Sequence, residues 1–256
     1  MITNPTVEVL MNRKSVRKYT DRKITRDELE TVVRAGQQAP FASQLYSVLY
    51  STDGPIAYGA PIWFVLCVDT YKLERFMNLR GWRIVTNNLT LLLMGMQDAA
   101  YMAENMVMAA ESLGMGSCFL GAVSSSAARI GAIRKRFGLP NRVLPMVELV
   151  MGYPDEEFPP RPRYPLAFAL FEDRYPELSD DDVRKAMKVM DDGYLRQEYY
   201  KQNGVKIELE DGRDDRYTFD DYSWTEHISR KWGQWTKSPN ELLDALQECG
   251  FGLFKD

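Results

Sequence analysis

Residues 88–123 read NLTLLLMGMQDAAYMAENMVMAAESLGMGSCFLGAV. Its first part, from Asn88 to Leu113, predicts a helix about 40 Å long at ~1.5 Å per residue. Leucine, methionine and alanine lie on more than one helical face, so we expect the helix to form the core axis or a subunit interface. The glycines of Gly114-Met-Gly116 signal its end, and Ser117 to Val123 is expected to be a strand.

Predicted helices and strands flank this stretch on both sides. A short amphipathic helix is expected from Thr6 to Met11, and Thr25 and Glu28 form a capping box that opens a helix to about Gln38. Further strands are expected over Leu45–Ser51, Ile62–Val68 and Val143–Gly152, and further helices over Ser126–Phe137, Asp180–Tyr200 and Pro239–Cys249. The alternation predicts an α/β or α+β layer, followed after Tyr153-Pro154 by a more polar C-terminal third.

Composition excludes several classes of function. The 256 residues carry a net charge of -4 with a pI near 5.3, so no global basic field draws the chain to nucleic acid or to a membrane surface. Three widely spaced cysteines and one histidine argue against a disulfide scaffold, a zinc site and Ser-His-Asp catalysis. The longest apolar run is too short to span a bilayer, and the N-terminus lacks a secretory signal, so a cytoplasmic protein is expected.

Two arginine pairs are candidates for anion binding. Arg13-Lys-Ser-Val-Arg17 places its arginines in a connector between helices, and Pro159-Pro-Arg161-Pro-Arg163-Tyr-Pro165 holds two more on a stiff backbone. The first run alone is equally explained as a solvated basic linker, and the second run alone is better explained as a proline-rich surface loop with incidental arginines. Two such pairs in an acidic protein favour a common anion. The glycines from Gly114 to Gly121 permit close approach of a flat ligand, although a helix end and a strand explain most of them.

Four segments in a fixed order resemble the nitroreductase family. They are R-x-S-x-R at 13–17, A-P-x-A-x-Q at 39–44, A-A-E-S-L-G-x-G at 109–116, and G-Y-P at 152–154 followed by R-P-R-x-P at 161–165. The chain is most similar to the larger, oxygen-insensitive branch of nitroreductases and flavin reductases. The resemblance implies one α+β domain over residues 1–256, with a mixed sheet flanked by helices over 1–153 and a C-terminal excursion over 154–256. It also implies an intertwined homodimer that holds FMN at the interface, with the excursion packed on the core and on the partner.

The resemblance also assigns roles to individual residues. Arg13, Lys14 and Ser15 would bind the FMN phosphate together with Arg161 and Arg163, and Arg17 would lie near the N1 and O2 edge, where it stabilises the reduced flavin. Pro40, Phe41, Ala42 and Gln44 would line the flavin ring and ribityl chain from the partner subunit, and Leu120, Gly121 and Ala122 would pass under the ring. No side chain need act as an acid or base, because the flavin N5 carries the chemistry.

The implied activity is ping-pong transfer of hydride from NADH or NADPH to a small acceptor such as a nitroaromatic, a quinone or a flavin. A flavin-binding or delivery protein without turnover, and a specialised member for dehalogenation or flavin fragmentation, are the alternatives. The chain departs from the family at two places. Tyr199-Tyr200 is followed by Lys-Gln-Asn203-Gly, where relatives place an arginine that binds the 2′-phosphate of NADPH; Lys201 or Lys206 would have to replace that arginine. The connector Thr52–Gly59 is shorter than the corresponding segment of relatives.

Overall fold

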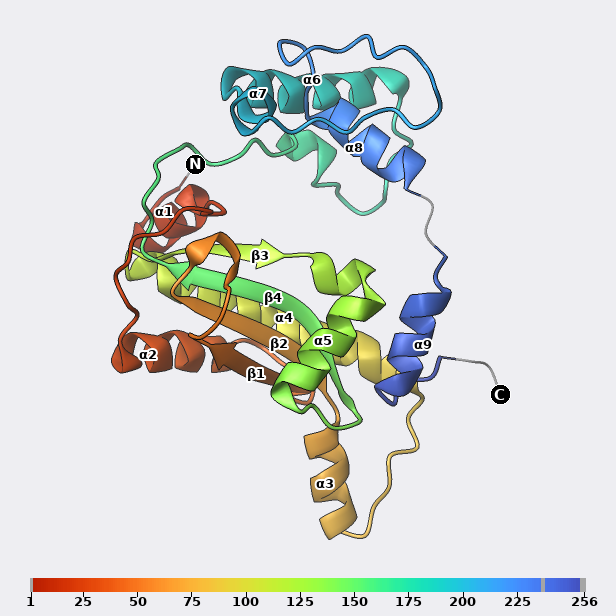
Figure 1. Ribbon diagram of the computed structural model, residues 1–256. Coiled ribbons are helices and arrows are strands. Elements are labelled where there is room, and N and C mark those ends of the chain that lie inside the picture. The colour runs from red at the N-terminus through yellow and green to blue at the C-terminus, as the bar shows by residue number, and fades with distance from the viewer. Residues whose placement is uncertain (1, 236–237, 254–256) are drawn as a thin grey trace. The chain divides into compact units, whose positions relative to one another are not determined.

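The computed structural model describes residues 2–235 and 238–253. The chain divides into two compact units, one formed by residues 1–158 with 238–256 and the other by residues 159–237. Each unit has its own secondary structure, shown in Figure 1. No helix among the described residues is both long and apolar enough to cross a bilayer.

A four-stranded sheet forms the centre of the first unit. Its strands are β1 (Tyr46–Ser51), β2 (Ile62–Asp69), β3 (Gly116–Leu120) and β4 (Val143–Gly152), in the order β1-β2-β4-β3. All three pairings between these strands are antiparallel, and an isolated bridge from Ser15 to Ser117 adds a parallel one. The predicted α+β class is therefore confirmed, as are the strands expected around β1, β2 and β4.

Helices cover both faces of this sheet, which explains why every residue of β2 is buried. Alternate residues of an extended strand point to opposite faces. Trp63 and Val65 accordingly join one hydrophobic cluster, and Phe64 and Leu66 join the other. The helices that supply these clusters are α2 (Arg26–Gln37) and α4 (Asn88–Ser112) on the Phe64 face, and α5 (Ala127–Phe137) and α9 (Asn240–Glu248) on the Trp63 face.

The predicted long helix is confirmed as α4, and the capping box of α2 forms with both of its hydrogen bonds in place. Ala99, Met102 and Met106 of α4 are buried in the core. Other apolar side chains of the same helix are exposed, and Leu93 retains 53% of its accessible surface. The helix thus packs one face on the sheet and leaves a second apolar face uncovered in the single chain.

Several boundaries differ from the expectations. The strand expected to reach Val123 ends at Leu120, because Gly121 leaves the extended region (φ -87°, ψ 5°) and a 3₁₀ turn, η2 (Ala122–Ser125), follows. The helix expected to reach Tyr200 breaks where Glu198 adopts a left-handed φ of 46°. The remaining helical segments are α1 (Pro5–Asn12), η1 (Ala57–Gly59), α3 (Tyr71–Leu79), η3 (Leu166–Phe168), α6 (Asp180–Arg196), α7 (Tyr199–Asn203) and α8 (Trp224–Gln234). Helices α3 and α8 were not anticipated.

The second unit packs α6 against α8 and α7. Asp191 of α6 accepts hydrogen bonds from the backbone N–H of Thr225 (2.8 Å) and from its hydroxyl (2.5 Å), which fixes the first turn of α8. The ring centroids of His227 and Tyr200 are 4.8 Å apart, and His227 Nδ1 lies 3.1 Å from the Tyr222 hydroxyl. Burial lowers the pKa of His227, and its ring packs as a partly buried side chain against these two tyrosines.

The chain returns to the first unit at its C-terminal end. The N–H of Arg142 donates to the Cys249 carbonyl at 2.7 Å, and the Arg142 guanidinium donates to the Gly250 carbonyl at 2.7 Å. Asn88 at the start of α4 donates to the Gly252 carbonyl at 3.0 Å. These contacts hold α9 and the residues after it on their own core. The single domain with an excursion over 154–256 that packs on a partner subunit stays a prediction.

Candidate functional site

The Arg13–Arg17 segment is an extended connector that runs beside β3. Helix α1 ends at Asn12, because the φ of -55° and ψ of 132° at Arg13 leave the helical region. The N–H of Val16 donates to the Ser117 carbonyl at 2.8 Å, and Val16 is buried to 1% of its surface. Because side chains alternate along an extended chain, burial of Val16 turns Ser15 and Arg17 to the opposite side, and Arg17 is exposed.

Arg13 and Lys14 place two cations at the start of this connector. The Arg13 guanidinium carbon lies 6.0 Å from the centre of the Phe119 ring, and Lys14 Nζ donates to the Phe158 carbonyl at 2.8 Å. Arg13 Nε and Ser117 Oγ are both buried without a hydrogen-bond partner among the described residues. A buried donor left unsatisfied is costly, so this position suits an anionic ligand with several oxygens.

Glu111, near the end of α4, interacts electrostatically with Arg13 and Lys14. Burial raises the pKa of its carboxyl to about 7, although Arg13 and Lys14 each act to lower it. Oε1 of Glu111 is also buried without a hydrogen-bond partner in the described part of the chain. A carboxyl that is partly neutral near pH 7 places less negative charge beside Arg13 and Lys14 than an exposed glutamate would.

Both the backbone and the guanidinium of Arg17 make hydrogen bonds. Its N–H donates to Glu156 Oε1 at 2.5 Å, and the N–H of Lys18 donates to the same oxygen at 3.1 Å. The Arg17 Nη1 also donates to the Ser15 carbonyl at 3.4 Å. Glu156 thus fixes the backbone at Arg17 and Lys18.

Leu120, Gly121 and Ala122 form the end of β3 and its exit turn. Gly121 and Ala122 are exposed, and a Cβ built on Gly121 would meet no atom of the described residues within 4 Å. The main chain is therefore open to a flat ligand at this point. The bridge from Ser15 to Ser117 places the connector beside the first part of the same strand, and Arg13 reaches the Phe119 ring, one residue before Leu120.

Residues Pro40, Phe41, Ala42 and Gln44 form an exposed loop between α2 and β1. Asp98, a residue of α4 that is only 1% exposed, holds this loop. Its carboxylate accepts from the N–H groups of Ala42 (2.6 Å), Ser43 (3.1 Å) and Leu45 (2.9 Å). Gln44 adopts a left-handed φ of 54°, which the fixed loop imposes on a non-glycine residue. Asp98 was missed from the sequence, where a lone aspartate inside an apolar helix was its only signal.

The loop before β1 and the exit turn of β3 belong to opposite edges of the sheet. The strand order β1-β2-β4-β3 puts two strands between them. At ~4.8 Å per strand, edges separated by three steps are about 14 Å apart. The structure does not bring the Pro40–Gln44 loop to Leu120–Ala122 within one chain.

Arg161 and Arg163 belong to the second unit. Arg161 donates from Nη1 to Gln197 Oε1 at 2.6 Å, and its guanidinium carbon lies 4.2 Å from the centre of the Tyr199 ring. Arg163 donates from Nη1 to the Arg161 carbonyl at 2.9 Å. Both arginines therefore have defined positions within their own unit.

The lysines that follow the tyrosine pair are engaged with carboxylates. Lys201 Nζ lies 2.7 Å from Asp220, and Lys206 Nζ lies 2.8 Å from Asp215 and donates to the Tyr217 carbonyl at 2.9 Å.

The short connector Thr52–Gly59 contains the turn η1 and is contacted by Arg136, which donates to the Asp53 carbonyl at 2.7 Å.

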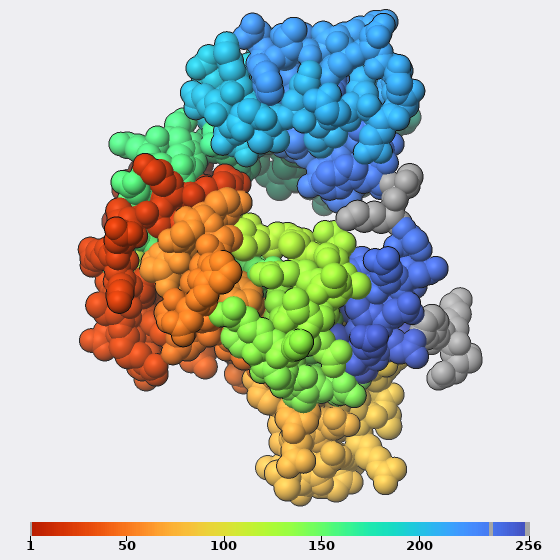
Figure 2. All heavy atoms as spheres, in the orientation of Figure 1, coloured from red at the N-terminus to blue at the C-terminus, as the bar shows by residue number. Residues whose placement is uncertain are grey.

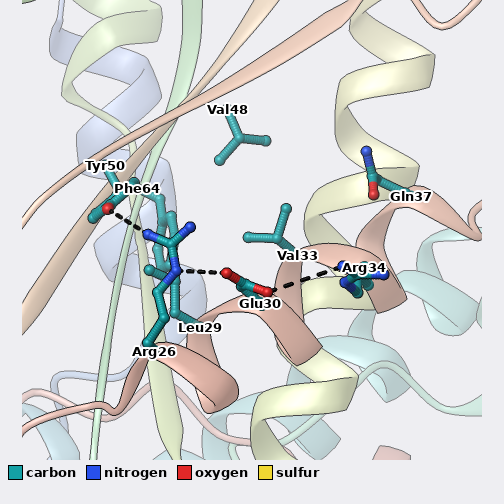
Figure 3. Close-up of a pocket in the computed structure, with 9 residues that line it drawn as sticks. All are labelled: Arg26, Leu29, Glu30, Val33, Arg34, Gln37, Val48, Tyr50 and Phe64. Carbon is teal, nitrogen blue, oxygen red and sulfur yellow. Dashed lines mark hydrogen bonds and ion pairs between the residues drawn. The ribbon is translucent and has the colours of Figure 1, made fainter.

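A cavity of about 490 Å³ opens elsewhere on the first unit, between α2 and the strands β1 and β2. Figure 3 shows Leu29, Val33 and Val48 among its lining and Arg26 hydrogen-bonded to Glu30 at 2.6 Å. None of the predicted site residues lines it. Its charged groups are paired with one another, and they form no arrangement of nucleophile and base.

The cysteines are free and buried, as expected of small hydrophobic side chains. Burial raises the pKa of Cys67 to about 12 and also raises the pKa values of Cys118 and Cys249, so none is a ready nucleophile. Among the described residues, no cluster of histidine, cysteine, aspartate and glutamate could hold a metal ion.

A family model for nitroreductases matches residues 10–52 and 53–153, which include the cationic connector, the loop on Asp98 and the exit turn of β3. The chain belongs to the nitroreductase family. The predicted resemblance is thereby confirmed. Among curated nitroreductase relatives, the FMN reductase (NADPH) of Bacillus subtilis strain 168 is 29% identical, with 97% of this chain and 98% of the relative aligned. The NADPH-flavin oxidoreductase of Vibrio harveyi is 30% identical over 73% of this chain and 81% of its own length.

Solved structures match nearly the whole chain. The NfrA1 nitroreductase of B. subtilis has a TM-score of 0.79 and 26% identity, covering 96% of this chain and 99% of its own. The NADPH:FMN oxidoreductase of V. harveyi complexed with NAD+ has a TM-score of 0.75 and 26% identity, covering 98% of this chain and all of its own. The family likeness therefore extends beyond the residues that the family model matches.

Proposed function

We propose that this chain is an FMN-dependent oxidoreductase that takes hydride from NADH or NADPH and passes it to a small organic acceptor, such as a nitroaromatic, a quinone or a flavin. The observation that carries the proposal is the alignment of nearly the whole chain with a relative named FMN reductase (NADPH). The scarcity of acid-base and nucleophilic side chains agrees with it, because bound FMN supplies the redox chemistry and the protein supplies binding and electrostatics.

The proposed phosphate site begins with Arg13, Lys14 and Ser15. The unsatisfied Arg13 Nε fits this assignment, because phosphate oxygens accept from guanidinium donors with charge-assisted hydrogen bonds. Arg161 and Arg163 are proposed to contribute to FMN retention as well. The open main chain at Gly121 fits a flat ring, with Leu120 and Ala122 beside it. Arg17 is proposed to stabilise negative charge that develops on the flavin when it is reduced.

The site is proposed to be completed by a second copy of the chain. Because the Pro40–Gln44 loop and the β3 exit turn lie on opposite edges of one sheet, a flavin over Gly121 would need the loop of a partner. Uncovered apolar side chains support such a homodimer, among them Leu93 of α4. Figure 2 shows α3 and the residues after it, in pale orange, standing out from the rest of the first unit. Trp82 and Val85 of this projection are 69% and 95% exposed.

The proposed donor preference follows from the ion pairs of Lys201 and Lys206. A 2′-phosphate distinguishes NADPH from NADH, and it would have to compete with Asp220 or Asp215 for either lysine. We therefore propose that NADH serves this enzyme at least as well as NADPH.

An anaerobic visible-absorbance titration of the purified protein with NADH and then NADPH tests the proposal. Loss of the yellow flavin band on addition of either nucleotide is the expected result. Bound flavin that neither nucleotide bleaches would favour a flavin-delivery protein or a specialised family member instead. A colourless protein that takes up no FMN on reconstitution would refute the proposed function.

A further inference from the structure

Gln197 joins the second arginine pair to α6 through both ends of its side-chain amide. Its Oε1 accepts from Arg161 Nη1 at 2.6 Å, and its Nε2 donates to the Pro160 carbonyl at 2.9 Å. A guanidinium can only donate and a carbonyl can only accept, so the two contacts fix which way the amide faces. Neither leucine nor a charged residue of similar length offers this donor and acceptor together.

The backbone around Gln197 is fixed as well. Gln197 ends α6, with its N–H donating to the Gly193 carbonyl at 3.3 Å, and Glu198 then turns the chain with a left-handed φ of 46°. Gly193 and Gln197 are four residues apart and so share one face of the helix. A Cβ on Gly193 would lie 2.4 Å from Pro162 Cγ, which shows how closely the proline ring packs there.

Arg161 is therefore held in place by contacts of the residues before and after it. Pro160 is hydrogen-bonded to Gln197, Pro162 packs on Gly193, and the Arg161 side chain between them reaches Gln197 and stacks on the Tyr199 ring at 4.2 Å. An arginine side chain loses considerable rotamer entropy when a ligand orders it. A side chain already held in one rotamer loses less on binding.

We infer that Gln197 is a positioning residue for FMN, which holds the Arg161 guanidinium ready for the phosphate group. The inference rests on the proposed role of Arg161 in FMN retention. Gln197 itself does not touch the phosphate in this assignment. Its amide accepts one N–H of the guanidinium and leaves the positive charge of the arginine intact.

Comparison of FMN with riboflavin isolates this role, because the two ligands share the ring and ribityl chain and differ in the phosphate. Dissociation constants of both are measured by flavin fluorescence on the full-length protein freed of flavin. Gln197→Met keeps the side-chain length and removes both hydrogen bonds. We expect it to weaken FMN about tenfold and to leave riboflavin within about twofold, since one well-placed hydrogen bond corresponds to roughly that factor.

Gln202→Met is the matched control, because Gln202 lies on α7 and is exposed, and its side-chain amide donates to Glu198 Oε2 at 3.5 Å. It should leave both constants unchanged. Arg161→Met should weaken FMN at least as much as Gln197→Met, and the double variant should be no weaker than Arg161→Met alone.

The outcomes separate the inference from the function it builds on. If Gln197→Met weakens FMN and riboflavin equally, or weakens neither, Gln197 has no phosphate-directed role and the inference is overturned. If Arg161→Met leaves the preference for FMN over riboflavin unchanged, the proposed role of Arg161 and the inference both fail. A wild-type protein that binds neither flavin would overturn the proposed function itself.

Discussion

The replacement Asp98→Asn tests how the loop of residues 40–44 is held. In the wild-type chain, Oδ1 of Asp98 accepts one backbone N–H and Oδ2 accepts two. Asparagine has nearly the same shape but only one oxygen, so its NH₂ group must face at least one N–H of the loop. That donor loses its partner, and the other contacts lose the negative charge that strengthens them.

The magnitude follows from these contacts. An unsatisfied buried donor costs about 1 to 3 kcal/mol, and a hydrogen bond to a neutral acceptor is worth ~1 kcal/mol less than one to a charged acceptor. Because Ala42 and Ser43 are exposed and water can replace part of the loss, we expect a decrease of about 2 to 4 kcal/mol in the free energy of unfolding. Urea unfolding measures the total, and hydrogen exchange at the amides of Ala42, Ser43 and Leu45 localises it.

Glu104→Gln provides the control, because Glu104 lies on the same helix with its side chain in solvent. It removes one negative charge from α4 without touching the loop, and should change stability by less than about 0.5 kcal/mol. If Asp98→Asn behaves like this control, or if exchange at the three amides is unaltered, the reasoning about the loop is wrong.

Three further predictions follow from the site. Replacing Arg161 and Arg163 together by alanine should weaken FMN retention far more than Lys18→Ala, since phosphate contacts contribute ~1.5 to 3 kcal/mol each, whereas Lys18 pairs with an exposed carboxylate at 2.9 Å. Equal retention on gel filtration would contradict the assignment. Burial raises the pKa of Glu111 from 4.5 to about 7, so the folded protein holds a proton that the unfolded chain releases between those values. This contribution to stability is present below pH 4.5 and is lost as the pH rises through 7, so Glu111→Gln should raise the melting temperature at about pH 8 and lose that advantage toward pH 5; a pH-independent effect would refute it. Finally, kcat/KM for NADH should equal or exceed that for NADPH in steady-state assays, and a clear preference for NADPH would show that the paired lysines yield to the phosphate.

Helices, strands and caps that have local causes could be predicted from the sequence. Thr25 and Glu28 cap α2 across one helical turn, the apolar run of β2 marks a strand covered on both faces, and Gly114 ends the long helix. The family was also within reach of the sequence, because its motifs are short segments in a fixed order. The position of the Arg13–Arg17 run between two helices was also predicted correctly, because both flanking helices have local signals.

The residues that support the candidate site could be identified only from the folded chain. Asp98 contacts a loop 53 to 56 residues away, and Gln197 contacts Arg161 across 36 residues. No periodicity relates such partners, since their meeting depends on how helices and loops pack. Strand order is likewise invisible in a strand's own pattern, yet it separates the Pro40–Gln44 loop from Gly121. Local patterns specify helices, strands and caps, whereas long-range packing selects the side chains that hold a binding loop or an arginine in place.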